Sequence, residues 1–390
     1  MLNGSIIGWS HIAFGKYPSD TLETLMAKVI PLAIADAGID PKDIDEGFIG
    51  LFNPGFSRQD FVSSLVMQSC PELRYKPFTR TENACASGSA AIFSGLKSIT
   101  AKTARFVLVV GVEKMTDLPN EQIGEGLLKA SYVKDEANIN GGFAGIFAQI
   151  AQKYFAKYGN QSATLAKIAA KNHANGVKNP YAQIRKDLGY DFCSTISDKN
   201  PIVAAPLRRT DCSLVSDGAV AVIIAEPTIA RKMDKCIDFR AATQTNDLLP
   251  MSMRDIIRFE GARYAWKASL EKAKISLKDI QLVETHDCFT IAELIEYEAM
   301  GLTEEGKGHQ AIDQGWVYRG GKLPVNISGG LKAKGHPIGA TGVSMHALVA
   351  MQLQGKAGEM QLSTNPALGA VFNMGGAGVA NYVSILERHK

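Results

Sequence analysis

Residues 80–99 read RTENACASGSAAIFSGLKSI and place a cysteine, Cys85, within a run of small residues. Behind it, apolar side chains recur at three- and four-residue spacing, which predicts a helix with one face on a core: Ala90, Ala91, Phe93, Leu96 and Ile99. Cys85 is therefore expected at a helix N-terminus, where backbone N–H groups and the helix dipole lower the pKa of a thiol. This stretch alone does not distinguish a nucleophile from a cysteine that fills the core.

The composition is that of an ordinary globular enzyme. The chain has 390 residues, enough for two domains or for one domain built twice, with 46% hydrophobic and 21% charged residues. A formal charge of +3 does not point to nucleic acid or to a membrane surface as a partner. The six cysteines are scattered without a CxxC pair, so we expect neither a metal site nor a disulfide framework. With no apparent signal peptide or membrane span, we expect a cytoplasmic protein.

The order of the expected elements indicates an α/β fold. Residues 4–14 and 45–51 read as strands on either side of a helix over 21–37, which Gly38 ends. The continuous apolar run at 105–112 favours a strand buried on both faces of a mostly parallel sheet. Residues 116–208 differ in composition and contain helical segments at 143–158 and 163–175, so they are expected to form an inserted lid. A buried strand returns at 216–226.

The second half of the chain repeats part of the first. Residues 33–50 and 268–285 share a helix, an isoleucine, a polar turn, Lys-Asp-Ile and a strand, at an offset of 236 residues (275 − 39). Later in each half a turn rich in small residues opens a helix. An internal duplication explains both features, which predicts two similar α/β halves. The expected domains are residues 1–115 with 209–230, the insertion at 116–208, and residues 231–390.

Two further stretches carry chemically capable side chains. ETHDCFTIAELIEYEAMGL (284–302) places His286, Asp287 and Cys288 between a strand and a helix, where open α/β sheets bind ligands. Taken alone, this triplet also fits a helix N-cap aspartate with two incidental neighbours. NISGGLKAKGHPIGATG (326–342) presents His336 just before another helix, as Pro337 keeps His336 out of helical geometry. A histidine so mounted is a candidate general base near neutral pH.

The glycine turn in FNMGGAGVANYVSIL (372–386) offers free backbone N–H groups, suited to an oxyanion hole and equally to a tight turn. In this order, the four motifs resemble the thiolase superfamily, and GVEKMTD (111–117) and KNHANGVKNPYAQ (171–183) extend the resemblance. His-Asp-Cys-Phe replaces the usual Asn-Glu-Ala-Phe, and Asn373 and Met374 stand where most thiolases have a cysteine. In both departures the chain resembles thiolases of the sterol-carrier-protein-2 type.

The resemblance implies a thiolase-like fold, with duplicated halves in a layered αβαβα arrangement, and a catalytic set of Cys85, His286, Cys288 and His336. Cys85 would carry the acyl group, His336 would take its proton, and Cys288 would exchange protons with the α-carbon or with coenzyme A. One oxyanion hole would consist of His286 and His336, and another of the N–H groups of Cys85 and Gly376. Coenzyme A and acyl-CoA enter as substrates, with no permanently bound cofactor, and the residues that contact coenzyme A are not identified.

The implied reaction cleaves 3-ketoacyl-CoA with coenzyme A or condenses acyl-CoA with acetyl-CoA. Alternatives are a retro-aldolase that acts on a CoA-linked side chain, a ketosynthase, and a non-catalytic subunit that binds acyl-CoA. Cys85 argues against the retro-aldolase, which does not need a cysteine nucleophile. The His-Asp-Cys-Phe motif argues against the ketosynthase, which usually uses a Cys-His-His set. The presence of both cysteines and both histidines argues against the non-catalytic subunit. The resemblance also implies a homodimer and leaves open a tetramer, a small accessory subunit, the acyl chain length and the direction of the reaction.

Overall fold

The strands of both halves join in one mixed sheet. The structure is a computed structural model and describes residues 2–389. Nine strands lie in the order β3-β2-β4-β7-β1-β8-β11-β10-β9. Their bounds are β1 Ser5–His11, β2 Glu46–Gly50, β3 Phe78–Thr81, β4 Phe106–Glu113, β7 Gly218–Ala225, β8 Ile237–Asn246, β9 Val283–Thr285, β10 Leu368–Gly375 and β11 Ala380–Arg388. Only two residue pairs join β1 to β8, so the first-half and second-half strands meet at a narrow seam.

The expectation of a mostly parallel sheet is wrong. β4 runs parallel to β2 but antiparallel to β7, and β1, β8 and β11 also pair antiparallel. A continuous apolar run reports burial on both faces, which a central strand has whatever the direction of its neighbours. The apolar pattern of β4 therefore could not reveal that the chain returns through β7 in the opposite direction.

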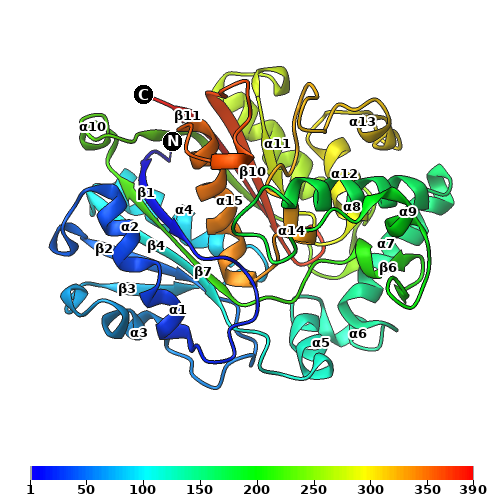
Figure 1. The fold of residues 1–390 in the computed structure, drawn as a ribbon, viewed down its shortest axis with the longest axis horizontal. Helices are drawn as coiled ribbons and strands as arrows, with labels where there is room; N and C mark the ends of the chain where they lie inside the picture. Colours follow the sequence, from blue (N-terminus) through cyan, green and yellow to red (C-terminus); the bar gives the residue numbers. More distant parts are fainter. Residues whose placement is uncertain (1, 390) are drawn as a thin grey trace.

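Helices fill three layers around the two halves of the sheet (Figure 1). α1 (Leu22–Ala27), α2 (Ile30–Ala37) and α3 (Val62–Ser69) cover the outer face of the first half. α4 (Ser87–Ala101) and α15 (Ile338–Leu353) share the central core with side chains from both halves. α11 (Glu260–Ala273) and α12 (Thr290–Ala299) cover the outer face of the second half. The predicted succession of helix, sheet, helix, sheet and helix layers is confirmed.

The duplicated segments fold alike. α2 ends at Gly38 and α11 ends at Lys274, both in the left-handed region, with φ of 70° and 54°. Each is followed by a short 3-10 turn closed by an aspartate, Asp43 or Asp279, and then by a strand. One detail differs from the prediction, because the single helix expected over 21–37 is two helices. Pro31 lies in the first turn of α2 and has no N–H to continue α1.

Residues 116–208 form a long excursion between the neighbouring strands β4 and β7, on the side of the molecule that Figure 1 shows at the right. Its elements are α5 Asn120–Leu128, α6 Val133–Glu136, α7 Gly142–Tyr158, α8 Ser162–Gly176, α9 Gly189–Ser194, β5 Ile202–Ala204 and β6 Leu207–Arg208. Outside this excursion, the described residues form three further short α-helices: α10 Pro227–Ala230, α13 His309–Asp313 and α14 Gly330–Ala333. α8 packs against α12 and α14, which belong to the second half. The exact domain boundaries stay a prediction.

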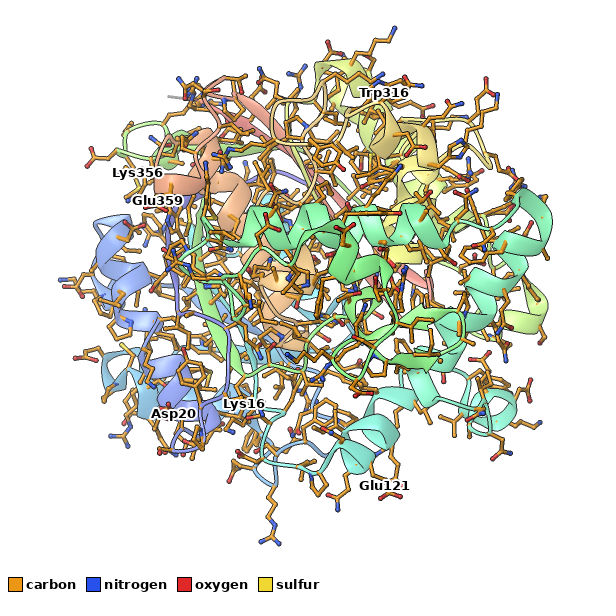
Figure 2. All side chains as sticks on the ribbon, turned by 45° about the vertical axis from the view of Figure 1, so that its right-hand side comes forward. Lys16, Asp20, Glu121, Trp316, Lys356 and Glu359 are labelled. Carbon is orange, nitrogen blue, oxygen red and sulfur yellow. The ribbon has the colours of Figure 1, made fainter. Side chains whose placement is uncertain are left out.

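The outer surface carries charges of both signs. Lys356 lies near Glu359, and Lys16 lies on the same side as Asp20, as Figure 2 shows. Across residues 2–389, the length and apolar character needed to cross a membrane are not combined in any helix.

The N-terminal ends of α4 and α15 meet backbone to backbone. A Cβ on Gly339 would lie 2.4 Å from the carbonyl oxygens of Gly50 and Val112, and a Cβ on Gly88 would lie 2.7 Å from the carbonyl oxygen of Gly339. Real Cβ atoms do not approach backbone this closely, so only glycine fits these positions. Because Cys85 precedes α4 and His336 precedes α15, this contact brings the two side chains together.

We expect Gly339→Ala to lower the free energy of unfolding by about 3 kcal/mol, the upper end of the usual range for overpacking, and to lower activity by displacing His336. The matched control is Gly124→Ala in α5, where an added Cβ meets nothing within 4 Å. Chemical denaturation of both variants measures the difference. An unchanged unfolding midpoint for Gly339→Ala would show that the close contact is not essential.

Candidate active site

Cys85 lies in a tight turn between β3 and α4 and is 3% exposed. The residue before it, Ala84, has a φ of 48°, a backbone geometry that a non-glycine residue adopts only when its surroundings hold it there. Ser87 supplies that support, since its hydroxyl donates to the Ala84 carbonyl at 2.6 Å and accepts from the Asn83 N–H at 2.9 Å. The first turn of α4 thus fixes the direction of the Cys85 side chain.

Two histidines from the second half converge on this thiol. His286 directly follows β9, and His336 precedes α15 by two residues. Their rings meet edge to face with centroids 5.1 Å apart. The Cys85 Sγ and one ring nitrogen of each histidine all lie within 4.8 Å of one another. The structure therefore brings together three of the four side chains that the sequence analysis proposed as catalytic.

Each histidine is anchored through its Nδ1 atom. The Nδ1 of His336 is 2.7 Å from the Thr341 hydroxyl, and the Nδ1 of His286 is 2.9 Å from the side-chain amide nitrogen of Asn373. The Nε2 atoms of both rings are buried and have no hydrogen-bond partner within residues 2–389. Buried polar atoms are normally paired, so two unpaired histidine nitrogens in a site that also holds a thiol indicate a place for a reacting group.

Burial sets the charge of the free site. It raises the pKa of the Cys85 thiol to about 12, partly offset by the N–H groups of Gly376 and of Cys85 itself. It lowers the pKa of His336 to about 3, with Lys332 and Lys334 adding to the effect. The expected low thiol pKa and the expected base near neutral pH are therefore both wrong for the free protein. Desolvation disfavours the charged form of both groups, and the resting pair is a neutral thiol and a neutral imidazole.

Cys288 completes the set, because it lines the same cavity as Cys85 and His336. Cys85, Cys288 and His336 all line a pocket of about 160 Å³, together with a largely apolar wall: Met115, Leu127, Phe143, Ala144, Val203, Cys212, Ser213, Leu214, Val215 and Phe289. Burial raises the pKa of the Cys288 thiol well above its usual range, and the nearby Cys85 raises it further. The Cys288 carbonyl is fixed by the ammonium of Lys332 at 2.9 Å.

The loop between β10 and β11 closes the site beside the thiol. Gly376 directs its N–H at the Cys85 sulfur and has a φ of 63°. An added Cβ at this position would lie 2.8 Å from the Ala130 carbonyl oxygen. The Gly376 N–H therefore lies beside the Cys85 sulfur, and its role as an oxyanion-hole donor stays a prediction.

A buried polar network holds the loop of His286 and Cys288 in place. Asp287 accepts from the Leu331 N–H at 2.7 Å and from the Asn172 side chain at 2.8 Å. The same amide donates to Glu293 at 2.6 Å, and Lys171 pairs with Glu293 at 2.6 Å. Asp287 is therefore not the N-cap of α12, whose cap residue is Phe289 without a side-chain bond. Burial and the nearby Glu293 raise the Asp287 pKa to about 7.

Sequence reasoning missed the residues that orient the site. Ser89 lies in the first turn of α4, about one turn after Cys85, and Thr341 lies in the first turn of α15, about one turn after His336. This spacing is the feature of the sequence that could have identified both hydroxyl residues. In the sequence, Asn373 stands out only as a departure from the usual cysteine. Glu113 accepts from the N–H groups of Phe52, Asn53 and Gly339 and so ties β4 to α15. Its pKa is raised to about 7 by burial.

The group of Cys85, His286 and His336 has the donor atoms of a zinc site. Zinc bonds of about 2.0–2.3 Å place tetrahedral ligands about 3.5 Å apart, so separations up to 4.8 Å would have to shrink before an ion was held. Within residues 2–389 all six cysteines are free thiols.

Two family models match the chain: one described as thiolase, N-terminal domain, over residues 5–228, and one described as thiolase C-terminal domain-like, over residues 242–388. An acetyl-CoA acetyltransferase from Methanothermobacter thermautotrophicus is 35% identical, with 100% of each chain covered. Human sterol carrier protein 2 is 32% identical over 88% of this chain and 64% of its own length. A solved Ltp2–ChsH2(DUF35) aldolase has a similar fold, with a TM-score of 0.84, 20% identity, and coverage of 100% of this chain and 98% of that chain.

Proposed function

The chain belongs to the thiolase family, and we propose that it moves acyl groups between carbon and the sulfur of coenzyme A through a thioester on Cys85. The enzyme class rests on relatives that are acetyl-CoA acetyltransferases and match the whole chain, so the chain is a CoA-dependent acyltransferase. The observation that carries the roles of the residues is the convergence of Cys85 with two histidines that each have an unpaired ring nitrogen, at a cavity that Cys288 also lines.

In the cleavage direction, the Cys85 sulfur attacks the 3-keto carbonyl carbon while His336 takes the thiol proton. The N–H groups of Cys85 and Gly376 receive the oxyanion, and each such donor typically contributes about 3 kcal/mol to lowering a barrier. The bond between C2 and C3 then breaks. His286 donates to the enolate oxygen of the leaving acetyl-CoA, and Cys288 gives its proton to C2.

Cys288 is then a thiolate and takes the proton of an incoming CoA thiol. The CoA sulfur attacks the acyl group on Cys85, and the departing Cys85 sulfur recovers its proton from His336. The two thiols and the imidazole return to their starting forms, so the cycle balances without an external acid or base. Condensation is the same sequence in reverse. A proton that moves during attack is consistent with the neutral resting pair of Cys85 and His336.

The size of the cavity supports a short acyl group. Its volume of about 160 Å³ is smaller than the roughly 300–1,000 Å³ of pockets that hold drug-sized ligands. Phe143 limits it on the α7 side and packs near Phe147 and Phe289, whose rings stack at 4.4 Å. We therefore propose acetoacetyl-CoA and similarly short 3-ketoacyl thioesters as substrates.

Phe143→Ala should favour longer substrates, because it removes a ring that bounds the acyl cavity. We expect the ratio of kcat/KM for 3-ketohexanoyl-CoA to that for acetoacetyl-CoA to rise about tenfold, the usual scale for adding or removing methylenes in an apolar pocket. Phe155→Ala is the matched control, since Phe155 also lies on α7 but does not line the cavity. An unchanged ratio would place the acyl chain elsewhere.

The retro-aldolase alternative is supported only by likeness of fold to an aldolase complex, and the presence of Cys85 argues against it. We further propose a cytoplasmic homodimer without a permanently bound cofactor. The edge strand β3 supports the dimer, since it has a neighbour on only one side, and the exposed aromatic residues Phe61 and Tyr75 precede it in the chain. An accessory subunit stays open.

The proposed function is tested by mixing the purified protein with acetoacetyl-CoA and coenzyme A and measuring acetyl-CoA formed. Turnover that is lost in Cys85→Ala supports it. Turnover that persists in Cys85→Ala, or its absence in the wild type with every short or long 3-ketoacyl-CoA tried, would overturn it.

A further inference from the structure

We propose that Asn373 and Thr341 are positioning residues that hold the two active-site histidines in opposite neutral tautomers. His336 then presents a bare Nε2 that accepts a proton, and His286 presents an Nε2–H that donates one. This inference rests on the proposed function and deepens it, because it assigns each histidine one task and names the residues that impose it.

The orientation of the Asn373 amide is fixed by two neighbours. Its nitrogen lies 3.2 Å from the Cys85 carbonyl oxygen, and a carbonyl can only accept. Its oxygen lies 2.7 Å from the hydroxyl of Ser89, which donates to it. The amide nitrogen, which can only donate, is also 2.9 Å from Nδ1 of His286. Nδ1 must therefore be the acceptor, and the single proton of the neutral ring lies on Nε2.

The Thr341 hydroxyl imposes the reverse arrangement on His336. Its one proton is directed to the Pro337 carbonyl oxygen at 3.0 Å, in the usual bond of a helical threonine to the preceding turn. The same oxygen lies 2.7 Å from Nδ1 of His336. With its proton already used, Thr341 accepts, and His336 carries its proton on Nδ1. The Nε2 of His336, buried and without a partner within residues 2–389, is then a lone pair.

The assigned tautomers match two different steps. A lone pair on His336 Nε2 can take the proton from Cys85 as its sulfur attacks, which leaves an imidazolium that later returns the proton. An N–H on His286 can donate to the enolate oxygen without first being charged. Burial favours neutral rings at both positions, since it holds the pKa of His286 and of His336 well below the usual value. The two histidines therefore need not share a task.

The tautomers can be read directly by long-range proton–nitrogen NMR of protein labelled with ¹⁵N-histidine. His346 supplies an internal reference, because its Nδ1 lies 2.7 Å from the Gly342 carbonyl, which can only accept. His336 should show the same pattern as His346, and His286 the opposite one. The same tautomer in His286 and His336, or the two patterns exchanged, would overturn the proposal whatever the enzyme catalyses.

Variants link each tautomer to one half-reaction. Asn373→Asp replaces the donor by an acceptor of the same shape, and we expect it to move the His286 proton to Nδ1 and to slow exchange of the acetyl-CoA methyl protons about 10²-fold. In the same variant, the rate at which acetyl-CoA acetylates Cys85 should change by less than about fivefold. Asn373→Ala repeats the test without a new charge, and we expect mixed tautomers of His286 with the same slow exchange.

Thr341→Val should act on the other half-reaction. It removes the acceptor for His336 Nδ1, and we expect Cys85 acetylation to slow about 10²-fold, within the range of general-base effects. Thr341→Ser keeps the hydroxyl and should restore the rate. Ser384→Ala is the matched control, because it removes the 2.8 Å partner of the buried His346 away from the cavity. If every variant slows methyl proton exchange and Cys85 acetylation equally, Asn373 and Thr341 have only a structural role. A wild type that fails both half-reactions but shows the expected tautomers would instead refute the proposed function.

Discussion

Replacing His336 with asparagine is expected to lower kcat/KM for acetoacetyl-CoA cleavage by about 10²- to 10⁴-fold, the range of a general base. The resting Cys85 is a thiol whose pKa burial raises to about 12, so it attacks efficiently only if a neighbour takes its proton. His336 is unprotonated at neutral pH, because its pKa is lowered to about 3. Its lone pair is therefore free throughout the physiological range, and the large gap between the two pKa values means that the proton moves only together with the attack of the sulfur on the carbonyl carbon.

Steady-state rates together with the rate of Cys85 acetylation measure this effect, and thermal unfolding checks that the variant is folded. His346→Asn is the matched control, since His346 is also buried and lies on α15 but does not line the cavity. If His336→Asn acetylates Cys85 at the wild-type rate, His336 is not the base.

Replacing Cys288 with alanine is expected to slow both half-reactions of acetoacetyl-CoA cleavage. Acetylation of Cys85 and turnover should both fall by about 10²- to 10⁴-fold, because the carbanion released by bond cleavage and the incoming coenzyme A both lose their proton partner. Cys288 suits this task because its thiol lines the same apolar cavity as Cys85.

Cys212→Ala provides the control for this experiment. Cys212 also lines the cavity, but the mechanism gives it no proton to carry, so its removal should leave turnover within about threefold of the wild type for an ordinary cavity-lining change. Normal turnover in Cys288→Ala, or an equal loss in Cys212→Ala, would remove Cys288 from the mechanism.

The local patterns of the sequence predicted the elements that carry the site. The helix after Cys85, the strand before His286 and the helix after His336 lie where periodicity and Pro337 placed them. The repeat at an offset of 236 residues likewise predicted two halves with similar folds. These features depend on neighbours in the chain, so the sequence alone was sufficient for them.

Features that depend on distant residues were not predictable in the same way. The antiparallel pairing of β4 with β7 joins strands that a long insertion separates in the chain, and an apolar run does not record the direction of a neighbour. The charge state of Cys85 is decided by burial in a site that residues from both halves line, which no local pattern records. The contact of Asn373 with His286 spans 87 residues, so no local pattern could indicate it.

The most direct test of the account is the intact mass of the protein after brief mixing with acetoacetyl-CoA, followed by peptide mapping. We predict a mass increase of one acetyl group, located on Cys85, that disappears when coenzyme A is added and never forms in Cys85→Ala. An unmodified protein that still produces acetyl-CoA, or an acetyl group on a residue other than Cys85, would contradict a reaction through a Cys85 thioester.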